Sequence, residues 1–159
     1  MQKITPFLWF NNQAEEAARF YVSVFKNSKI NAITHYGEGA PVTKGTVMTV
    51  SFNLDGEEFL ALNGGPVFTI SPAISFVVNC KTQEEIDNFW DKLSKGGEPG
   101  ECGWLKDKYG VSWQIVPNIL GELMSIADNE QSQRVMLEVM KMKKLEIKTI
   151  ERAYKQLLV

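Results

Sequence analysis

Cysteine and histidine are scarce in this chain, and neither sign of charge dominates it. Its 159 residues include two cysteines and one histidine, and the formal net charge is −2. Two cysteines do not make a disulfide framework, so we expect free thiols and a cytoplasmic protein. The near-balanced charge gives no electrostatic reason to bind nucleic acid. A single histidine excludes a metal site built from several imidazoles.

Long apolar runs are also missing. No run approaches the roughly 20 residues that span a bilayer, so we expect no membrane partner. The first ten residues, MQKITPFLWF, carry one lysine and no long apolar core, which is unlike a signal peptide. With 44% hydrophobic and 23% charged residues, the composition suits one globular domain, with or without an appendage.

An internal repeat is the main feature of the first three quarters of the chain. The segments 7–25 and 74–93 each begin with a short apolar strand and continue into a helix with a Glu pair and an aromatic pair. The two Glu pairs and the two aromatic pairs are both 69 positions apart. Apolar residues at helical spacing support both helices. We expect Asn12 to cap the first helix, and Thr82 with Glu85 to form a capping box on the second.

Strands follow each helix. We expect strands at 30–36, at 48–54 with one buried face, and at 58–62, and the Asp55-Gly56 pair predicts a hairpin turn between the last two. In the second half, we expect the corresponding strands at 97–102, around Trp104 and at 112–116. The order is β-α-β-β-β, twice.

The composition changes after Pro117. Apolar residues at helical spacing predict three short helices, and Asp128-Asn129 predicts a break and cap between the first two. Four methionines in this part suit a packed tail, because Met fills irregular gaps. A dimer contact or a lid over a pocket remains the alternative.

The segment from Cys102 to Pro117, CGWLKDKYGVSWQIVP, is the most unusual stretch. It reads as a strand, a turn and a strand, yet it holds two tryptophans, a cysteine and an amide within an apolar strand. Trp113 and Gln114 are adjacent, so they face opposite sides of the sheet.

The doubled module resembles the vicinal oxygen chelate superfamily, which includes glyoxalase I, extradiol dioxygenases and bleomycin-resistance proteins. The resemblance is closer to its PhnB-like branch, often labelled "3-demethylubiquinone-9 3-methyltransferase". AEEAARFYVSVF, ALNGGPVFTISPAISFVVNC, CGWLKDKYGVSWQIVP and the Met- and Lys-rich tail carry it. It implies an α+β fold: a tandem domain at 1–117, with modules at about 1–64 and 72–117 around a cleft, and a helical extension at 118–159. It also implies a homodimer.

Enzymes of this superfamily usually hold a divalent metal on the first and last strands of each module. The resemblance places these four positions at Ile4 or Thr5, at Leu60 or Ala61, at Ala73 and at Gln114. Only Gln114 is a plausible ligand, and His35 lies away from all four. We therefore expect no metal.

The methyltransferase label implies a site for S-adenosylmethionine. The usual site is a Gly-rich turn between a strand and a helix. The only Gly cluster after a strand, Asn63-Gly64-Gly65-Pro66, continues into proline and apolar residues. A plain turn is the better interpretation, and no cofactor is expected.

The sequence therefore predicts a metal-free protein that binds a small molecule. With Gln114 directed into the cleft, Trp113 becomes core, and the candidate ligand-binding residues are Trp9, Glu58, Cys102, Trp104 and Gln114. Cys102 is either a reactive thiol or a structural one. The alternative function is an enzyme of the same superfamily, with Gln114 and a carboxylate or thiol acting on an unknown substrate.

Overall fold

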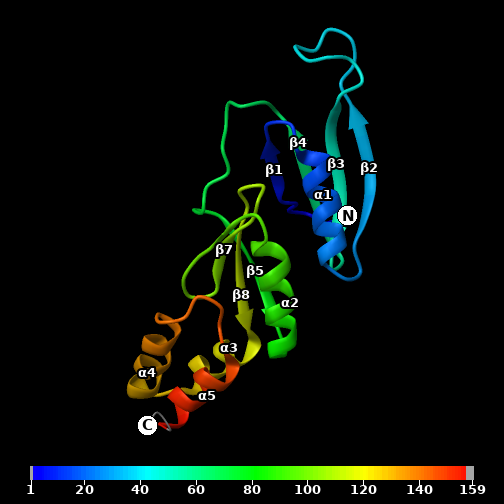
Figure 1. The fold of residues 1–159 in the computed structure, drawn as a ribbon. Helices are drawn as coiled ribbons and strands as arrows, with labels where there is room; N and C mark the ends of the chain where they lie inside the picture. The colour runs from blue at the N-terminus through cyan, green and yellow to red at the C-terminus, as the bar shows by residue number, and fades with distance from the viewer. Residues whose placement is uncertain (1, 157–159) are drawn as a thin grey trace. The chain divides into compact units, whose positions relative to one another are not determined.

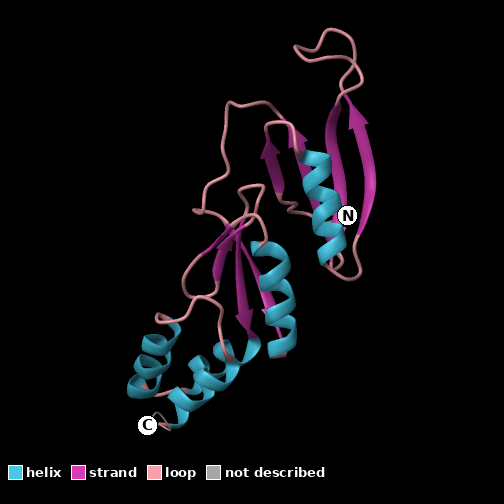
Figure 2. Cartoon of the chain, viewed as in Figure 1, coloured by secondary structure: helices cyan, strands magenta, loops and turns pink. Residues whose placement is uncertain are grey.

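The computed structural model describes residues 2–156, and the chain divides into two compact units, Met1–Ile70 and Ser71–Val159. Each unit contains one four-stranded sheet and one helix that packs on it (Figures 1 and 2). The second unit also contains three C-terminal helices. The predicted α+β class and the doubled β-α-β-β-β order are confirmed.

The first unit runs β1, α1, β2, β3, β4, and its sheet has the order β1-β4-β3-β2. β1 is parallel to β4, and the other neighbours are antiparallel. The bounds are Phe7–Phe10 for β1, Ala14–Val24 for α1, Lys29–His35 for β2, Val47–Leu54 for β3 and Glu57–Asn63 for β4.

One face of this sheet packs under α1. The helix buries alanines and Tyr21 at i, i+3, i+4 spacing. Alternate residues of the strands face this helix and are buried against it. Tyr21, Phe52 and Phe59 form a stack whose ring centroids lie 6.4 Å and 5.6 Å apart. The buried strand residues are Leu8, Phe10, Val50, Phe52, Leu54, Phe59 and Ala61.

The turn between β3 and β4 has the predicted form. Asp55 and Gly56 have positive φ angles of 49° and 88°. A two-residue hairpin with both φ angles positive matches the twist of its strands, and Asp-Gly adopts it at little cost. This tight turn fixes the register of the β3–β4 pair.

The predicted cap of α1 is wrong. The N-cap is Gln13, which makes no side-chain cap hydrogen bond. Asn63, at the end of β4, accepts a hydrogen bond from the Ala14 N–H at 2.8 Å instead. The helix start is thus satisfied by a residue 49 positions away, which also ties α1 to the sheet.

The second unit repeats the arrangement as β5, α2, β6, β7, β8, with the sheet order β5-β8-β7-β6. β5 is parallel to β8. The bounds are Ser75–Cys80 for β5, Gln83–Ser94 for α2, Glu98–Pro99 for β6, Trp104–Lys106 for β7 and Ser112–Pro117 for β8. The strand expected at 97–102 is therefore only two residues long, because the chain turns at Cys102 and Gly103, which both have positive φ.

Thr82 caps α2 as predicted. Its hydroxyl accepts a hydrogen bond from the Glu85 N–H at 3.2 Å. The Glu85 carboxylate reaches one residue further back than a capping box requires and accepts from the Lys81 N–H at 2.6 Å. The helix buries Ile86, Trp90 and Leu93.

The C-terminal part forms the three predicted helices, α3 (Asn118–Ile126), α4 (Asn129–Val139) and α5 (Ile147–Lys155). Asp128 and Gln131 make a full capping box on α4. The helices enclose a separate buried cluster of Val135, Val139, Leu145, Ile150 and Ala153. From Gln2 to Gln156, no helix is both long enough and apolar enough to cross a membrane.

Candidate functional site

Each sheet has a second face that its own helix does not cover. In the first unit, this open face carries the strand residues that alternate with the buried ones. The register places them in rows across the sheet, with Trp9, Leu62, Thr49 and Thr34 in one row and Phe7, Leu60 and Ser51 in the next. A third row contains Glu58, Asn53 and Lys29.

The half of this face over β1 and β4 is apolar. Phe7 is 53% exposed, and Trp9, Leu60 and Leu62 are half-buried. The Trp9 ring is held by the segment after β4, because its indole N–H donates to the Gly65 carbonyl at 2.9 Å and Phe68 meets it edge-on at 5.0 Å. A Cβ on Gly64 would lie 2.3 Å from the Trp9 ring. The Asn63-Gly64-Gly65-Pro66 turn is therefore a close backbone support for a tryptophan.

The half of the face over β2 and β3 is polar. The Thr34 and Thr49 hydroxyl groups share a hydrogen bond, and the Asn31 amide donates to the Asn53 side-chain oxygen. Ser51 lies between these pairs on β3. The open face is thus divided along the strands into an apolar half and a hydrogen-bonding half.

Glu58 lies on β4, the strand that carries Leu60 and Leu62 on the apolar half. It is half-buried, and one carboxylate oxygen lies 3.5 Å from the Ser51 Oγ. The carboxylate is therefore directed across the sheet toward β3.

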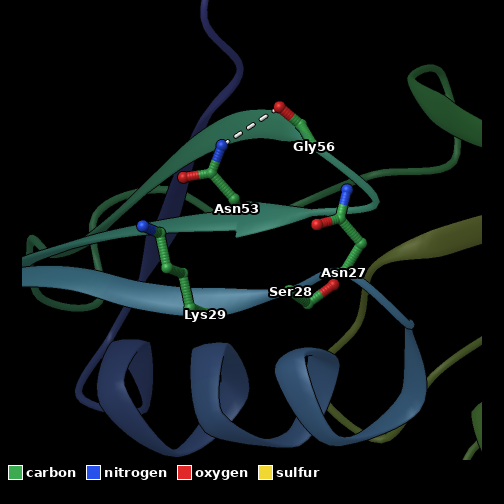
Figure 3. A pocket seen from close by; sticks show the side chains of 5 residues that line it. All are labelled: Asn27, Ser28, Lys29, Asn53 and Gly56. Atoms are coloured by element: carbon green, nitrogen blue, oxygen red, sulfur yellow. Dashed lines mark hydrogen bonds between the residues drawn. The ribbon is translucent and has the colours of Figure 1, made fainter.

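A polar pocket of about 290 Å³ opens at the hairpin end of the same sheet. Figure 3 shows its Lys29 and Asn53 side chains on the side of the strands that faces away from the helix. The Asn53 amide donates to the Gly56 carbonyl at 3.1 Å and closes this end. The pocket is lined by Asn27, Ser28, Lys29, Asn53 and Gly56.

The open face of the second sheet carries Gln114 and Trp104. The register pairs Gln114 with both Trp104 and Val77, so these three residues form one row. The Gln114 amide donates to the Ser75 Oγ at 2.9 Å. Lys106, on β7, forms an ion pair with Glu98 at 2.9 Å. Gln114 therefore lies on the open face, as the family resemblance implies.

Trp113 faces the other way and belongs to the core. It is 3% exposed, packs against Phe76 at 5.5 Å, and donates its indole N–H to the Asp107 carboxylate at 2.8 Å. The other Asp107 oxygen accepts from the Tyr109 and Val111 N–H groups. The buried aspartate, which the sequence analysis did not single out, thus organises the turn between β7 and β8.

The two cysteines are both free thiols. Burial, with a smaller effect of the nearby Glu85 carboxylate, raises the pKa of the Cys80 thiol to about 11. Cys102 packs against the C-terminal helical cluster, and its N–H donates to the Met142 carbonyl at 2.7 Å. These contacts of Cys102 are with the C-terminal part of the chain, and its contact with a ligand stays a prediction.

The residues at the superfamily's metal positions do not fit a divalent metal. Ile4 and Thr5 lie before β1, and Ala73 lies before β5. Ile4 and Ala73 are exposed, and Thr5 is half-buried. On β4 the choice between Leu60 and Ala61 resolves to Leu60, because Ala61 is buried under α1. Gln114 alone offers a side-chain oxygen on a strand at these positions. Within residues 2–156, no group of three or more His, Cys, Asp or Glu could hold a metal ion, and His35 is exposed on β2.

The usual S-adenosylmethionine site is equally poorly matched. It needs a Gly-rich turn that leads from a strand into a helix of a parallel sheet. Here both sheets are mixed, and the Gly64-Gly65 turn leads from β4 to β5 with no helix between them. Gly64 lies against the Trp9 ring, so packing in this turn already explains the need for a glycine there.

Sequence reasoning missed several residues of the open face in the first unit. The alternation with buried residues on β3 could have identified Thr49, Ser51 and Asn53. On β4, Leu60 and Leu62 lie two and four positions after Glu58, so all three side chains share one face. The pocket lining carried no recognisable signal, because it depends on how the turn at Asn27 meets the hairpin at Gly56.

Comparisons with known proteins agree on the family. The family model described as 3-demethylubiquinone-9 3-methyltransferase matches residues 2–116. The chain is 44% identical to the PhnB protein from Bacillus cereus, with 73% of this chain and 99% of that one covered and a TM-score of 0.66. The comparison with curated proteins found no match.

More distant structures share the fold alone. Protein PA1353 from Pseudomonas aeruginosa is 20% identical, with a TM-score of 0.61 over 74% of this chain and 98% of that one. The fosfomycin resistance protein FosX from Listeria monocytogenes is 14% identical, with a TM-score of 0.54 over 76% and 94%. The two β-α-β-β-β modules thus have a vicinal oxygen chelate type of fold, and the chain belongs to the PhnB-like family labelled 3-demethylubiquinone-9 3-methyltransferase.

Proposed function

We propose that this protein binds a small organic molecule without the help of a divalent metal. In the first unit, the ligand lies against the open face of the sheet, where Trp9 and Glu58 are its contacts. In the second unit, the open face offers Trp104 and Gln114 as candidate contacts. Such binding does not require the methyltransferase activity that the family label names.

The open face of the first sheet is the observation that carries this proposal. A sheet with one solvated face normally alternates apolar residues inside with polar residues outside. Here Phe7, Trp9, Leu60 and Leu62 stand on the outer face beside a polar half. Apolar surface with a few placed polar groups is typical of small-molecule sites.

The absence of suitable ligands at the metal positions supports a metal-free site. Divalent metals in such folds require several imidazole or carboxylate ligands. Leu60 and Gln114 occupy the matching strand positions of the two modules, and neither supplies one. The Gln114 amide is instead engaged with the Ser75 hydroxyl.

A thermal-shift series tests the proposal. Protein stripped with a chelator is mixed separately with Zn²⁺, Ni²⁺, Mn²⁺, S-adenosylmethionine and a panel of aromatic compounds. A ligand that binds only the folded state raises the melting midpoint by mass action. We expect a rise with members of the aromatic panel and none with the metals or S-adenosylmethionine.

The other outcomes separate the alternatives. A rise with one metal, abolished by Gln114→Leu, would contradict the metal-free site and favour an enzyme of the same superfamily. A rise with S-adenosylmethionine would support the methyltransferase label. The Glu38→Gln variant, which changes an exposed carboxylate in the β2–β3 loop, serves as a matched control for nonspecific metal binding.

We further propose a homodimer. Several large apolar side chains remain exposed between β4 and β5, including Val67, Phe68 and Ile74. Such exposure commonly marks an interface. Light scattering coupled to size exclusion should give twice the chain mass of 17.9 kDa. A single-chain mass at all concentrations would contradict the dimer.

A further inference from the structure

We propose, on the basis of the proposed function, that the ligand carries a cationic group next to an apolar or aromatic body, and that the Glu58 carboxylate holds that cation. Glu58 occupies the open face of the first sheet beside the apolar half. The backbone contacts of Glu58, its half-buried carboxylate and the neutral residue beside it support this assignment.

The backbone at Glu58 is held in place by an unusual contact. β1 pairs with β4 only from Leu60 onward, so residue 58 lies beyond the end of its neighbouring strand. The Gln2 side chain takes over there, since its amide donates to the Glu58 carbonyl at 3.2 Å and its oxygen accepts from the Glu58 N–H at 2.9 Å. The primary amide thus imitates a paired strand residue and fixes the origin of the side chain.

The carboxylate itself has no ionic partner in the described part of the chain. It contacts the Ser51 hydroxyl at 3.5 Å, and no ion pair of residues 2–156 includes Glu58. Its direct cross-strand neighbour on β3, Asn53, is neutral. The nearest cation along the row is Lys29, on the far side of Asn53. Two strand spacings separate β4 from β2, or about 10 Å.

A half-buried carboxylate beside apolar side chains favours a cation from the ligand. Its charge is screened less than that of a fully exposed group, and it adjoins Leu60 and Phe7, where a ligand body displaces water. A charge-assisted hydrogen bond from an ammonium group is stronger than one between neutral groups. The Lys29 ammonium is exposed and lies at the edge of the polar pocket, so solvent weakens its hold on an anion.

The apolar half sets the size of the ligand body. Leu60 and Leu62 stand two and four residues beyond Glu58 on β4, which corresponds to about 7 and 13 Å along the strand. The Trp9 ring lies at the far end of this apolar surface, beside Leu62, and the hydrogen bond to the Gly65 carbonyl holds it there. A fused or substituted aromatic ring with an amine on a short arm fits this length.

Three naphthalene probes of similar size separate charge from shape. They are 1-naphthylmethylamine, which is cationic at neutral pH, the neutral 1-naphthylmethanol and the anionic 1-naphthoate. Affinity is measured by isothermal titration calorimetry on the full chain for wild type, Glu58→Gln and the matched control Lys29→Gln. The isosteric Glu58→Gln leaves the Gln2 contacts in place, because those involve backbone atoms.

We expect wild type to bind the amine about tenfold more tightly than the alcohol, which corresponds to about 1.4 kcal/mol. Glu58→Gln should remove this preference while the affinity for the alcohol stays unchanged, which also shows that the variant is folded. Lys29→Gln should keep the preference.

Two results would overturn the inference while leaving the proposed function intact. One is equal binding of amine and alcohol to wild type. The other is tightest binding of the naphthoate, lost in Lys29→Gln, which would assign the polar pocket to an anion instead. Failure of all three probes to bind would count against the proposed function itself, and this inference would fall with it.

Discussion

At the scale of single residues, the buried Cys80 thiol makes the free energy of unfolding depend on pH in the alkaline range. Its pKa is raised to about 11 by burial and by Glu85, whereas a thiol in an unfolded chain ionises near about 8.5. Between these values the unfolded chain loses a proton that the folded protein keeps. Ionisation therefore favours unfolding, and the free energy of unfolding falls as pH rises, by about 1–2 kcal/mol up to about pH 10.

Urea unfolding of wild type and Cys80→Ala at several pH values measures this effect. Lysines and tyrosines titrate in the same range, so the difference between the two proteins isolates the thiol. We expect Cys80→Ala to be less stable at pH 8 and the gap to narrow as pH rises. Parallel curves would show that the thiol ionises equally well in the folded state.

Asp107 is the residue on which the turn between β7 and β8 depends. It is 2% exposed and accepts hydrogen bonds from the Tyr109 N–H, the Val111 N–H and the Trp113 indole. Asp107→Ala leaves these buried donors without this acceptor, so we expect a loss of about 2–4 kcal/mol in chemical denaturation. The exposed Asp91 on α2 gives the control, and Asp91→Ala should change stability by less than about 0.5 kcal/mol.

At the scale of elements, Gln83 joins α2 to the C-terminal helices. Its amide donates to the Leu145 carbonyl at 3.1 Å, and its oxygen accepts from the Ile147 N–H at 2.9 Å, which starts α5. The ion pair of Asp87 with Lys144 lies beside this contact. Hydrogen bonds from Lys144 and then Gln83 lower the pKa of Asp87, but both charged groups are substantially exposed to solvent.

Solvent screening makes the ion pair the weaker of the two links. We expect Gln83→Ala to cost about 1–2 kcal/mol in urea unfolding, because it leaves the first N–H of α5 without its acceptor. Lys144→Ala should cost less than about 1 kcal/mol. A larger loss for Lys144→Ala would mean that charge, and not the amide contact, holds the helices in place.

Local periodicity explains why so much of the fold was predictable. The alternation in β3 and in β8 places neighbouring side chains on opposite faces, so it predicts that Trp113 and Gln114 point in opposite directions. The family resemblance predicts that Gln114 is the one on the open face. The Asp55-Gly56 turn and the caps at Thr82 and Asp128 depend on residues within a few positions, and all three are confirmed.

Contacts between distant parts of the chain explain the misses. The cap of α1 comes from Asn63, and Gln2 and Gln83 complete backbone pairings 56 and more than 60 residues away. The repeat also changes register: the helices keep the 69-residue offset, but the buried Leu8 and Phe10 match Val78 and Cys80 at 70. A loop shorter by one residue before α2 absorbs the difference, which no periodicity shows.

At the scale of the whole molecule, the C-terminal helices lie outside the residues that the family model matches. The family model ends at residue 116, and the Bacillus cereus protein matches 73% of this chain with 99% of its own length. In this chain, the Met142 and Lys143 carbonyls accept from the Cys102 and Gly103 N–H groups at 2.7 Å, and Leu145 packs on Gly103.

Removal of residues 118–159 should therefore loosen one turn and leave the second sheet folded. Cys102 loses its cover and its backbone partner, so we expect its alkylation by iodoacetamide to accelerate by about tenfold or more and the melting midpoint to fall. Cys80, buried under α2 in the same unit, is the internal control and should remain slow. If both thiols react quickly, the helices are needed to fold the unit, and if neither rate changes, the turn at Cys102 holds its shape without them.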